Sequence, residues 1–134
     1  MSKHLNEPKA CPACEEKLLQ AHPTLAEWFR NQVKPEHQDC HISWSFRDKM
    51  SQNEAHAEGK SKLSWPNSKH NTIKPDGTPC AEALDLFQIC SNGMAAWSWK
   101  YFKQIADEVA AHAEPIKWGG AWQKFDDSDH FELA

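Results

Sequence analysis

Residues 83–89, Ala-Leu-Asp-Leu-Phe-Gln-Ile, are an apolar run that carries one carboxylate, and they constrain the fold more than any other segment. Their length and apolar content predict a strand that is largely buried. A carboxylate is rarely buried unless it is paired or bound to a metal, because removing its charge from water is unfavourable. Asp85 therefore needs a polar or metallic partner inside the folded chain.

The remaining segments predict helices and strands in turn. Helical periodicity covers 15–33, with an interruption at Pro23, a new N-cap at Thr24 and an end at Pro35. The other expected elements are a strand at 41–46, a polar helix at 48–58 stopped by Gly59, a turn-rich loop at 66–80, a helix at 97–113, a short strand at 116–118 and a final short apolar run. This order indicates an α+β domain.

Length and charge exclude several classes of protein. The chain has 134 residues, which predicts one domain over 1–134. Its formal charge of −4, with scattered Lys and Arg, argues against nucleic acid as a partner. No apolar run is long enough to cross a bilayer, and the N-terminal residues lack the apolar core of a signal peptide. We therefore expect cytoplasmic synthesis and no membrane partner.

The cysteines are odd in number, which without an export signal favours reduced thiols over a disulfide framework. Cys11-Pro-Ala-Cys14 is a CxxC motif that, with Cys40 and His41, or with His22, would make a second, structural zinc site. The interpretation as free thiols at the start of a helix is favoured, because no second CxxC follows at ribbon spacing. The other cysteines, expected to be small core residues, are Cys80 and Cys90.

Three short segments carry residues suited to metal-assisted hydrolysis: SKH at 68–70, ALD at 83–85 and DSDH at 127–130. Zinc binds imidazole and carboxylate, and a catalytic site uses three protein ligands and leaves one position for water. The metal lowers the pKa of that water, and a nearby carboxylate takes its proton. Asp127 is suited to this role beside His130, with Asp126 and Asp129 as alternatives.

The order of the motifs resembles the VanY-type D-alanyl-D-alanine carboxypeptidase family, and within it the phage endolysins that act as L-alanyl-D-glutamate peptidases. The resemblance covers 42–133. The matching pieces are SFRDKMSQNEAHAEGKS for the S-x-x-R…Q…G-x-S segment, Ser68-Lys69-His70 for S-x-H, Ala83-Leu84-Asp85 for A-x-D, Trp118-Gly119-Gly120-Ala121-Trp122 for W-G-G-D-W, and Asp127-Ser128-Asp129-His130-Phe131 for D-x-x-H-F.

The resemblance implies a fold and a set of site residues. The fold would be a small antiparallel sheet flanked by helices, as in hedgehog and D-Ala-D-Ala peptidases, with a helical part at 1–40 and a catalytic core at 41–134. One zinc ion would be bound by His70, Asp85 and His130, with Asp127 as the general base. Arg47 would orient the substrate; alternatively, it caps the following helix or pairs with Asp48. The implied substrate-binding residues are Arg47, Gln52, Ser68, Trp118 and Trp122.

The function implied is hydrolysis of the L-Ala–D-Glu bond in the peptidoglycan stem peptide. Alternatives are a D-Ala-D-Ala carboxypeptidase or dipeptidase, and a non-catalytic binding module such as the hedgehog signalling domain. We expect a monomer that acts on the cell wall after release from the cytoplasm, encoded by a phage or prophage. The loop at 71–82 is longer than in the family, and it either bulges away from the site or reshapes the substrate groove.

Overall fold

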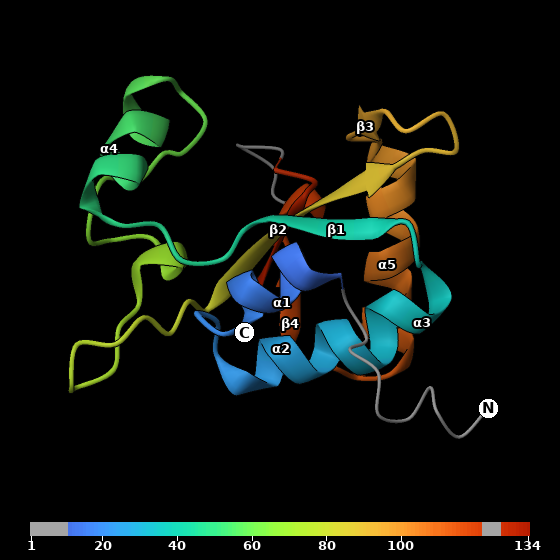
Figure 1. Cartoon of the computed structure of the whole chain (residues 1–134), viewed down its shortest axis with the longest axis horizontal. Coiled ribbons are helices and arrows are strands. Elements are labelled where there is room, and N and C mark those ends of the chain that lie inside the picture. Colours follow the sequence, from blue (N-terminus) through green and yellow to red (C-terminus); the bar gives the residue numbers. More distant parts are fainter. Residues whose placement is uncertain (1–10, 122–126) are drawn as a thin grey trace.

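An antiparallel sheet packs against helices in the computed structural model, which describes residues 11–121 and 127–134 (Figure 1). Within these residues, no helix combines the length and apolar character that a transmembrane span requires. The elements in chain order are α1 Pro12–Leu18, α2 Pro23–Trp28, the π-helical η2 Phe29–Val33, α3 Lys34–Glu36, β1 Cys40–Trp44, α4 Lys49–Ala57, the 3-10 helix η3 Lys69–Asn71, β2 Ala83–Ile89, β3 Ala95–Ala96, α5 Trp99–Ala111, β4 Ile116–Trp118, the 3-10 helix η4 Gly119–Ala121 and β5 His130–Leu133.

The sheet has the order β1-β2-β5-β4, and the short β3 pairs with the far end of β2. Successive side chains of a strand point to opposite faces, so each strand divides its residues between two environments. Leu84, Leu86 and Phe131 join the hydrophobic core together with side chains of α1, α2, η2 and α5. Asp85 and His130, which are direct partners across β2 and β5, therefore point to the other face. The predicted small antiparallel sheet flanked by helices is confirmed.

The N-terminal helical stretch is divided before Pro23 and ends next to Pro35, as predicted, but the capping residue differs. α1 ends at Leu18 and α2 begins at Pro23, so the predicted interruption is present, and proline is well tolerated in the first turn of the second helix. The cap is His22, whose Nδ1 accepts the backbone N–H of Thr24 at 3.1 Å, so the prediction of Thr24 as N-cap is wrong. For the same reason Pro35 lies inside α3, and the helical stretch ends at Glu36.

The other elements agree closely with the prediction. The strand at 83–89 has the predicted bounds, and α4 begins after Asp48, whose carboxylate accepts the N–H of Ser51 at 2.8 Å. Gly59, with a φ of 77°, ends this segment. In Figure 1, α4 and the following loops lie to one side of the sheet and helices.

The first helix lies along the open edge of the sheet. β1 is an edge strand, and its Ile42 N–H is donated to Cys14 Sγ of α1 at 3.3 Å. Further along, the hydroxyl of Ser45 donates to the carbonyl of Lys17 at 2.7 Å. Because an uncovered edge strand is a template for aggregation, α1 protects this side of the sheet.

Candidate metal centre

Two imidazoles and one carboxylate meet on the open face of the sheet. Oδ1 of Asp85 lies 3.1 Å from Nε2 of His70 and 3.0 Å from Nδ1 of His130. All three side chains are buried, and their ligand atoms lie within 4.8 Å of one another. This donor set is one that zinc prefers, so the three residues fit a zinc ion. The structure thus brings together the three predicted ligands, including Asp85.

Local structure explains how each ligand reaches this point. Asp85 and His130 face each other in the register of β2 and β5. His70 lies in η3, a 3-10 turn closed by a capping box in which Ser68 accepts the N–H of His70 and Asn71 accepts the N–H of Ser68. Ser68, predicted as a substrate-binding residue, therefore holds in place the turn that carries His70.

Each histidine is oriented by a second partner. Nδ1–H of His70 donates to the carbonyl of Ser45 at 2.6 Å, which leaves Nε2 facing Asp85. Nε2–H of His130 donates to the Glu132 carboxylate at 2.8 Å, which leaves Nδ1 facing Asp85. Metal-binding histidines typically donate their other N–H in this way. The sequence reasoning did not identify Glu132, although its position two residues after His130 on one strand places both side chains on the same face.

Arg47 is paired with the central carboxylate. Its Nη2 donates to Oδ2 of Asp85 at 2.8 Å, and its Nη1 lies 3.4 Å from Oε1 of Gln52. Asp48 instead caps α4, so it is not the partner of Arg47. The Nε of Arg47 is buried and has no hydrogen-bond partner among the described residues. Arg47 thus fixes Asp85, and its Nε–H stays without a partner within the described part of the fold.

The electrostatics follow from this packing. Burial alone would raise the pKa of Asp85, but the neighbouring imidazoles of His70 and His130 hold the pKa far below its usual range. Burial would lower the pKa of His130, whereas its hydrogen bonds to Asp85 and Glu132 raise the pKa to about 10. A protonated imidazole cannot bind a metal, so metal binding at this site must displace a proton from His130.

Two further carboxyls, Asp127 and Asp129, lie against Asp85. Burial raises the pKa of Asp127, whose Oδ2 is 3.7 Å from Nδ1 of His130. Burial, together with the charges of Asp85 and Asp127, raises the pKa of Asp129 to about 8. A bound cation would counteract both shifts. The other alternative base, Asp126, lies outside the described residues.

Two cavities adjoin His70, Asp85 and His130. The first, of about 390 Å³, is lined by 60–63, by 67–70 and by Asp127, His130 and Glu132. The second, of about 510 Å³, is lined by residues that include Trp44, Asp85, Trp97 and Asp129. Both are lined by Arg47, Lys60 and Asp127. Asp127 therefore faces both cavities, whereas Asp129 faces only the second.

The remaining predicted residues have supporting positions. Gln52 is fully buried and donates to the Leu63 carbonyl at 2.6 Å, so it holds the wall of the first cavity. Trp118 lines a different cavity against α5, and its Nε1–H donates to the Ser128 carbonyl at 2.7 Å, within the turn that carries Asp127 and His130. Trp122 lies outside the described residues.

The long loop between the first two ligands closes on itself. Backbone hydrogen bonds join Lys74 to Thr78 and Thr72 to Cys80, and Ile73 pairs with Pro79. None of residues 71–82 lines either cavity. Of the two predicted outcomes for this loop, the structure shows the bulge away from the site.

Comparison with known proteins agrees with this geometry. No protein-family model matches the chain, and no curated protein matches its sequence. Among solved structures, it is similar to the crystal structure of the L-Ala D-Glu endopeptidase ChiX from Serratia marcescens. The TM-score is 0.72 and the identity 27%, over 92% of this chain and 87% of that chain. Fold and site thus define an α+β protein of the peptidase class. Within that class, the predicted resemblance to the L-alanyl-D-glutamate endopeptidases is confirmed.

Proposed function

We propose that this chain is a zinc-dependent peptidoglycan endopeptidase that cuts the L-Ala–D-Glu bond of the stem peptide. The observation that carries the proposal is the convergence of His70, Asp85 and His130 beside two cavities. The similarity over most of the chain to an L-Ala D-Glu endopeptidase supports a hydrolase that acts on peptidoglycan.

The mechanism assigns separate tasks to the residues of the site. Zinc, held by His70, Asp85 and His130, would polarise the scissile carbonyl and lower the pKa of a water molecule. Asp127 takes the proton of that water and passes it to the leaving amine, as a general base and then a general acid. Its position between the two cavities suits this role better than that of Asp129.

The shape of the site favours an endopeptidase over a carboxypeptidase. An endopeptidase must accommodate substrate on both sides of the scissile bond, and the two cavities that share Arg47, Lys60 and Asp127 provide this room. The first cavity is also lined by Lys62 and by Lys69, the latter paired with Glu132 at 3.4 Å, and these positive charges face the space for a substrate that contains D-glutamate. Arg47 lines both cavities while its Nη2 holds Asp85, which places its positive charge beside the substrate.

The place of synthesis and the oligomeric state also belong to the proposal. Synthesis in the cytoplasm, followed by action on the wall after release, fits a phage or prophage lysis enzyme and stays a prediction. So does the monomeric state. A binding module without activity is the less favoured alternative, because a pure binder has no need of a carboxyl such as Asp127 beside the metal-binding residues.

The test is digestion of defined muropeptides by the full chain, first stripped of metal and then reloaded with zinc. We expect mass spectrometry to show products cut between L-Ala and D-Glu only after zinc is restored. Release of terminal D-Ala instead would establish the carboxypeptidase. Binding of muropeptides without any cleavage by the zinc-loaded chain would establish the binding module.

A further inference from the structure

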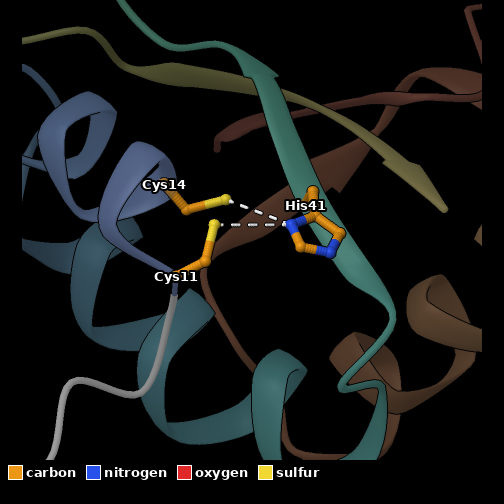
Figure 2. Close-up of side chains that lie close together, drawn as sticks. All are labelled: Cys11, Cys14 and His41. Atoms are coloured by element: carbon orange, nitrogen blue, oxygen red, sulfur yellow. Dashed lines mark hydrogen bonds between the residues drawn. The ribbon is translucent and has the colours of Figure 1, made fainter. Parts of the chain in front are cut away.

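A second group of metal-binding side chains lies at the junction of α1 and β1 and shares no residue with the site described above. Cys11 immediately precedes α1, Cys14 lies within α1, and His41 lies on β1. Figure 2 shows both sulfurs directed at one ring nitrogen. Nδ1 of His41 is 3.5 Å from Sγ of Cys11 and 3.7 Å from Sγ of Cys14.

These distances match the edges of a tetrahedral zinc site. With Zn–S of about 2.3 Å and Zn–N of about 2.0–2.1 Å, a tetrahedral angle separates sulfur from nitrogen by about 3.6 Å. All three ligand atoms also lie within 4.8 Å of one another. A single ion can therefore contact both sulfurs of the CxxC motif and the imidazole of His41.

Nδ1 of His41 lies near two thiols at once, and the two thiols also interact with each other. A neutral imidazole nitrogen has either one lone pair or one hydrogen, so Nδ1 of His41 can form a good hydrogen bond with only one of the two thiols. A metal ion uses both contacts, because each thiolate and the nitrogen supplies it with one electron pair.

The surrounding residues hold the three side chains in place. The Ile42 N–H donated to Cys14 Sγ at 3.3 Å orients that sulfur; burial raises the pKa of the Cys14 thiol to about 11, so a bound metal would displace its proton. The ring of His41 packs against Phe87, with centroids 5.7 Å apart. Cys14 is buried, while Cys11 and His41 are half-buried, so an ion here would be accessible during loading and then shielded.

Of the residues that could complete a zinc site with the CxxC motif, His41 is the one placed beside the two cysteines. Cys40 is fully buried in the hydrophobic core, because consecutive residues of β1 point to opposite faces. His22 instead caps α2 through its Nδ1. Of the possible partners, His41 alone completes the cluster within the described residues.

We propose that Cys11, Cys14 and His41 bind a second zinc ion, which fastens α1 to the edge strand β1. The site has a structural role because it joins two elements, although its three protein ligands leave the fourth coordination position to water, whereas most structural zinc sites fill that position with a fourth side chain. Such an ion stabilises the folded chain because the unfolded chain holds no preformed site. It would keep the open edge of the sheet covered, independently of catalysis at His70, Asp85 and His130.

Cobalt replacement in the reduced full-length chain tests the proposal, since only a sulfur ligand gives a thiolate-to-cobalt charge-transfer band in the near ultraviolet. The expected result is a strong band in the wild type and in His70→Ala. Its loss is expected in the Cys11→Ser/Cys14→Ser double variant. The matched control is Cys90→Ser, which replaces a half-exposed cysteine outside the cluster and should keep the full band.

A second measurement covers the case in which the double variant fails to fold. Thiol labelling of the wild type, mapped by mass spectrometry, should show Cys11 and Cys14 protected in the presence of zinc and reactive after chelation. The proposal is overturned if reduced wild type has no charge-transfer band, or if the band survives in a folded double variant. Labelling of both cysteines that is insensitive to zinc, or a Cys11–Cys14 disulfide that resists reductant, would overturn it equally.

Discussion

Replacing Glu132 with Gln tests the contribution of one carboxylate to the proposed metal centre, although it also removes the ion pair of Glu132 with Lys69 at 3.4 Å. Glu132 accepts Nε2–H of His130 at 2.8 Å, and its side chain is 16% exposed. A hydrogen bond to a charged group contributes about 1.5–3 kcal/mol, against about 1 kcal/mol for a neutral pair. Gln keeps an acceptor but loses the charge, so we expect a loss of about 1–2 kcal/mol in zinc affinity, a factor of about 5–30.

The pH dependence gives this prediction a sharper form. Zinc competes with a proton for His130, whose pKa is raised to about 10, so zinc affinity should weaken as the pH falls below that value. Glu132 stabilises the protonated imidazole of His130 as well as the zinc-bound one. Glu132→Gln therefore lowers the affinity of His130 for a proton as well as for zinc. At low pH zinc must displace this proton, so the weaker binding of the proton partly offsets the weaker binding of zinc. The loss of zinc affinity should therefore be smaller near pH 6 than near pH 9.

Competition with a chromogenic chelator measures zinc affinity across this range without depending on activity. Glu82→Gln is the matched control, because Glu82 is half-exposed and lies next to Ala83, the register partner of Glu132. Equal zinc affinity in the two variants at every pH, or a loss from Glu132→Gln that does not change with pH, would refute the reasoning.

Two other variants test the base and the turn that carries it. Asp127→Asn should lower kcat by about 10²–10⁴-fold with zinc content unchanged, and Asp129→Asn should lower kcat by a smaller factor. Muropeptide kinetics measure kcat, and metal analysis measures the zinc content. A larger loss of kcat in Asp129→Asn than in Asp127→Asn would make Asp129 the base. A Cβ at Gly119 would lie 2.3 Å from the Asp127 carbonyl oxygen and 3.1 Å from His130 Cβ, so Gly119→Ala should reduce stability by about 1–3 kcal/mol and also impair activity. The control is Gly93→Ala, because Gly93 has a φ of 85° and an added Cβ there would meet no atom within 4 Å. It should reduce the free energy of unfolding by about 1 kcal/mol without loss of activity. Equal activity in the two alanine variants would contradict the steric argument.

Local patterns were sufficient for much of the fold. The length and apolar content of 83–89 predicted β2, and the polar pattern before Gly59 predicted α4, whose cap at Asp48 the structure adds. The two-residue β3 was not predicted, because Ala95–Ala96 has no strand pattern and pairs only through its contact with β2. The cap of α2 was misplaced because its acceptor is the imidazole of His22, a residue type that is not among the usual N-caps.

For the site, sequence motifs located residues but not their partners. His70, Asp85 and His130 were placed together correctly, and Asp85 required a partner on physical grounds alone. Its ion pair with Arg47 and the orienting bond from His130 to Glu132 depend on side-chain directions that only the assembled sheet defines. The position of Trp118 against α5 likewise depends on tertiary packing.

The self-paired loop at 72–80 offers a position for engineering the protein. Its ends are tied by the hydrogen bond from Cys80 N–H to the Thr72 carbonyl, and its tip at 74–78 is exposed apart from its own turn contacts. Loop tips of this kind are the sites at which inserted domains are best tolerated. A cell-wall-binding module or a fluorescent reporter could therefore be grafted between Asp76 and Gly77, in the middle of the chain, while the metal-binding residues and both cavities stay as they are.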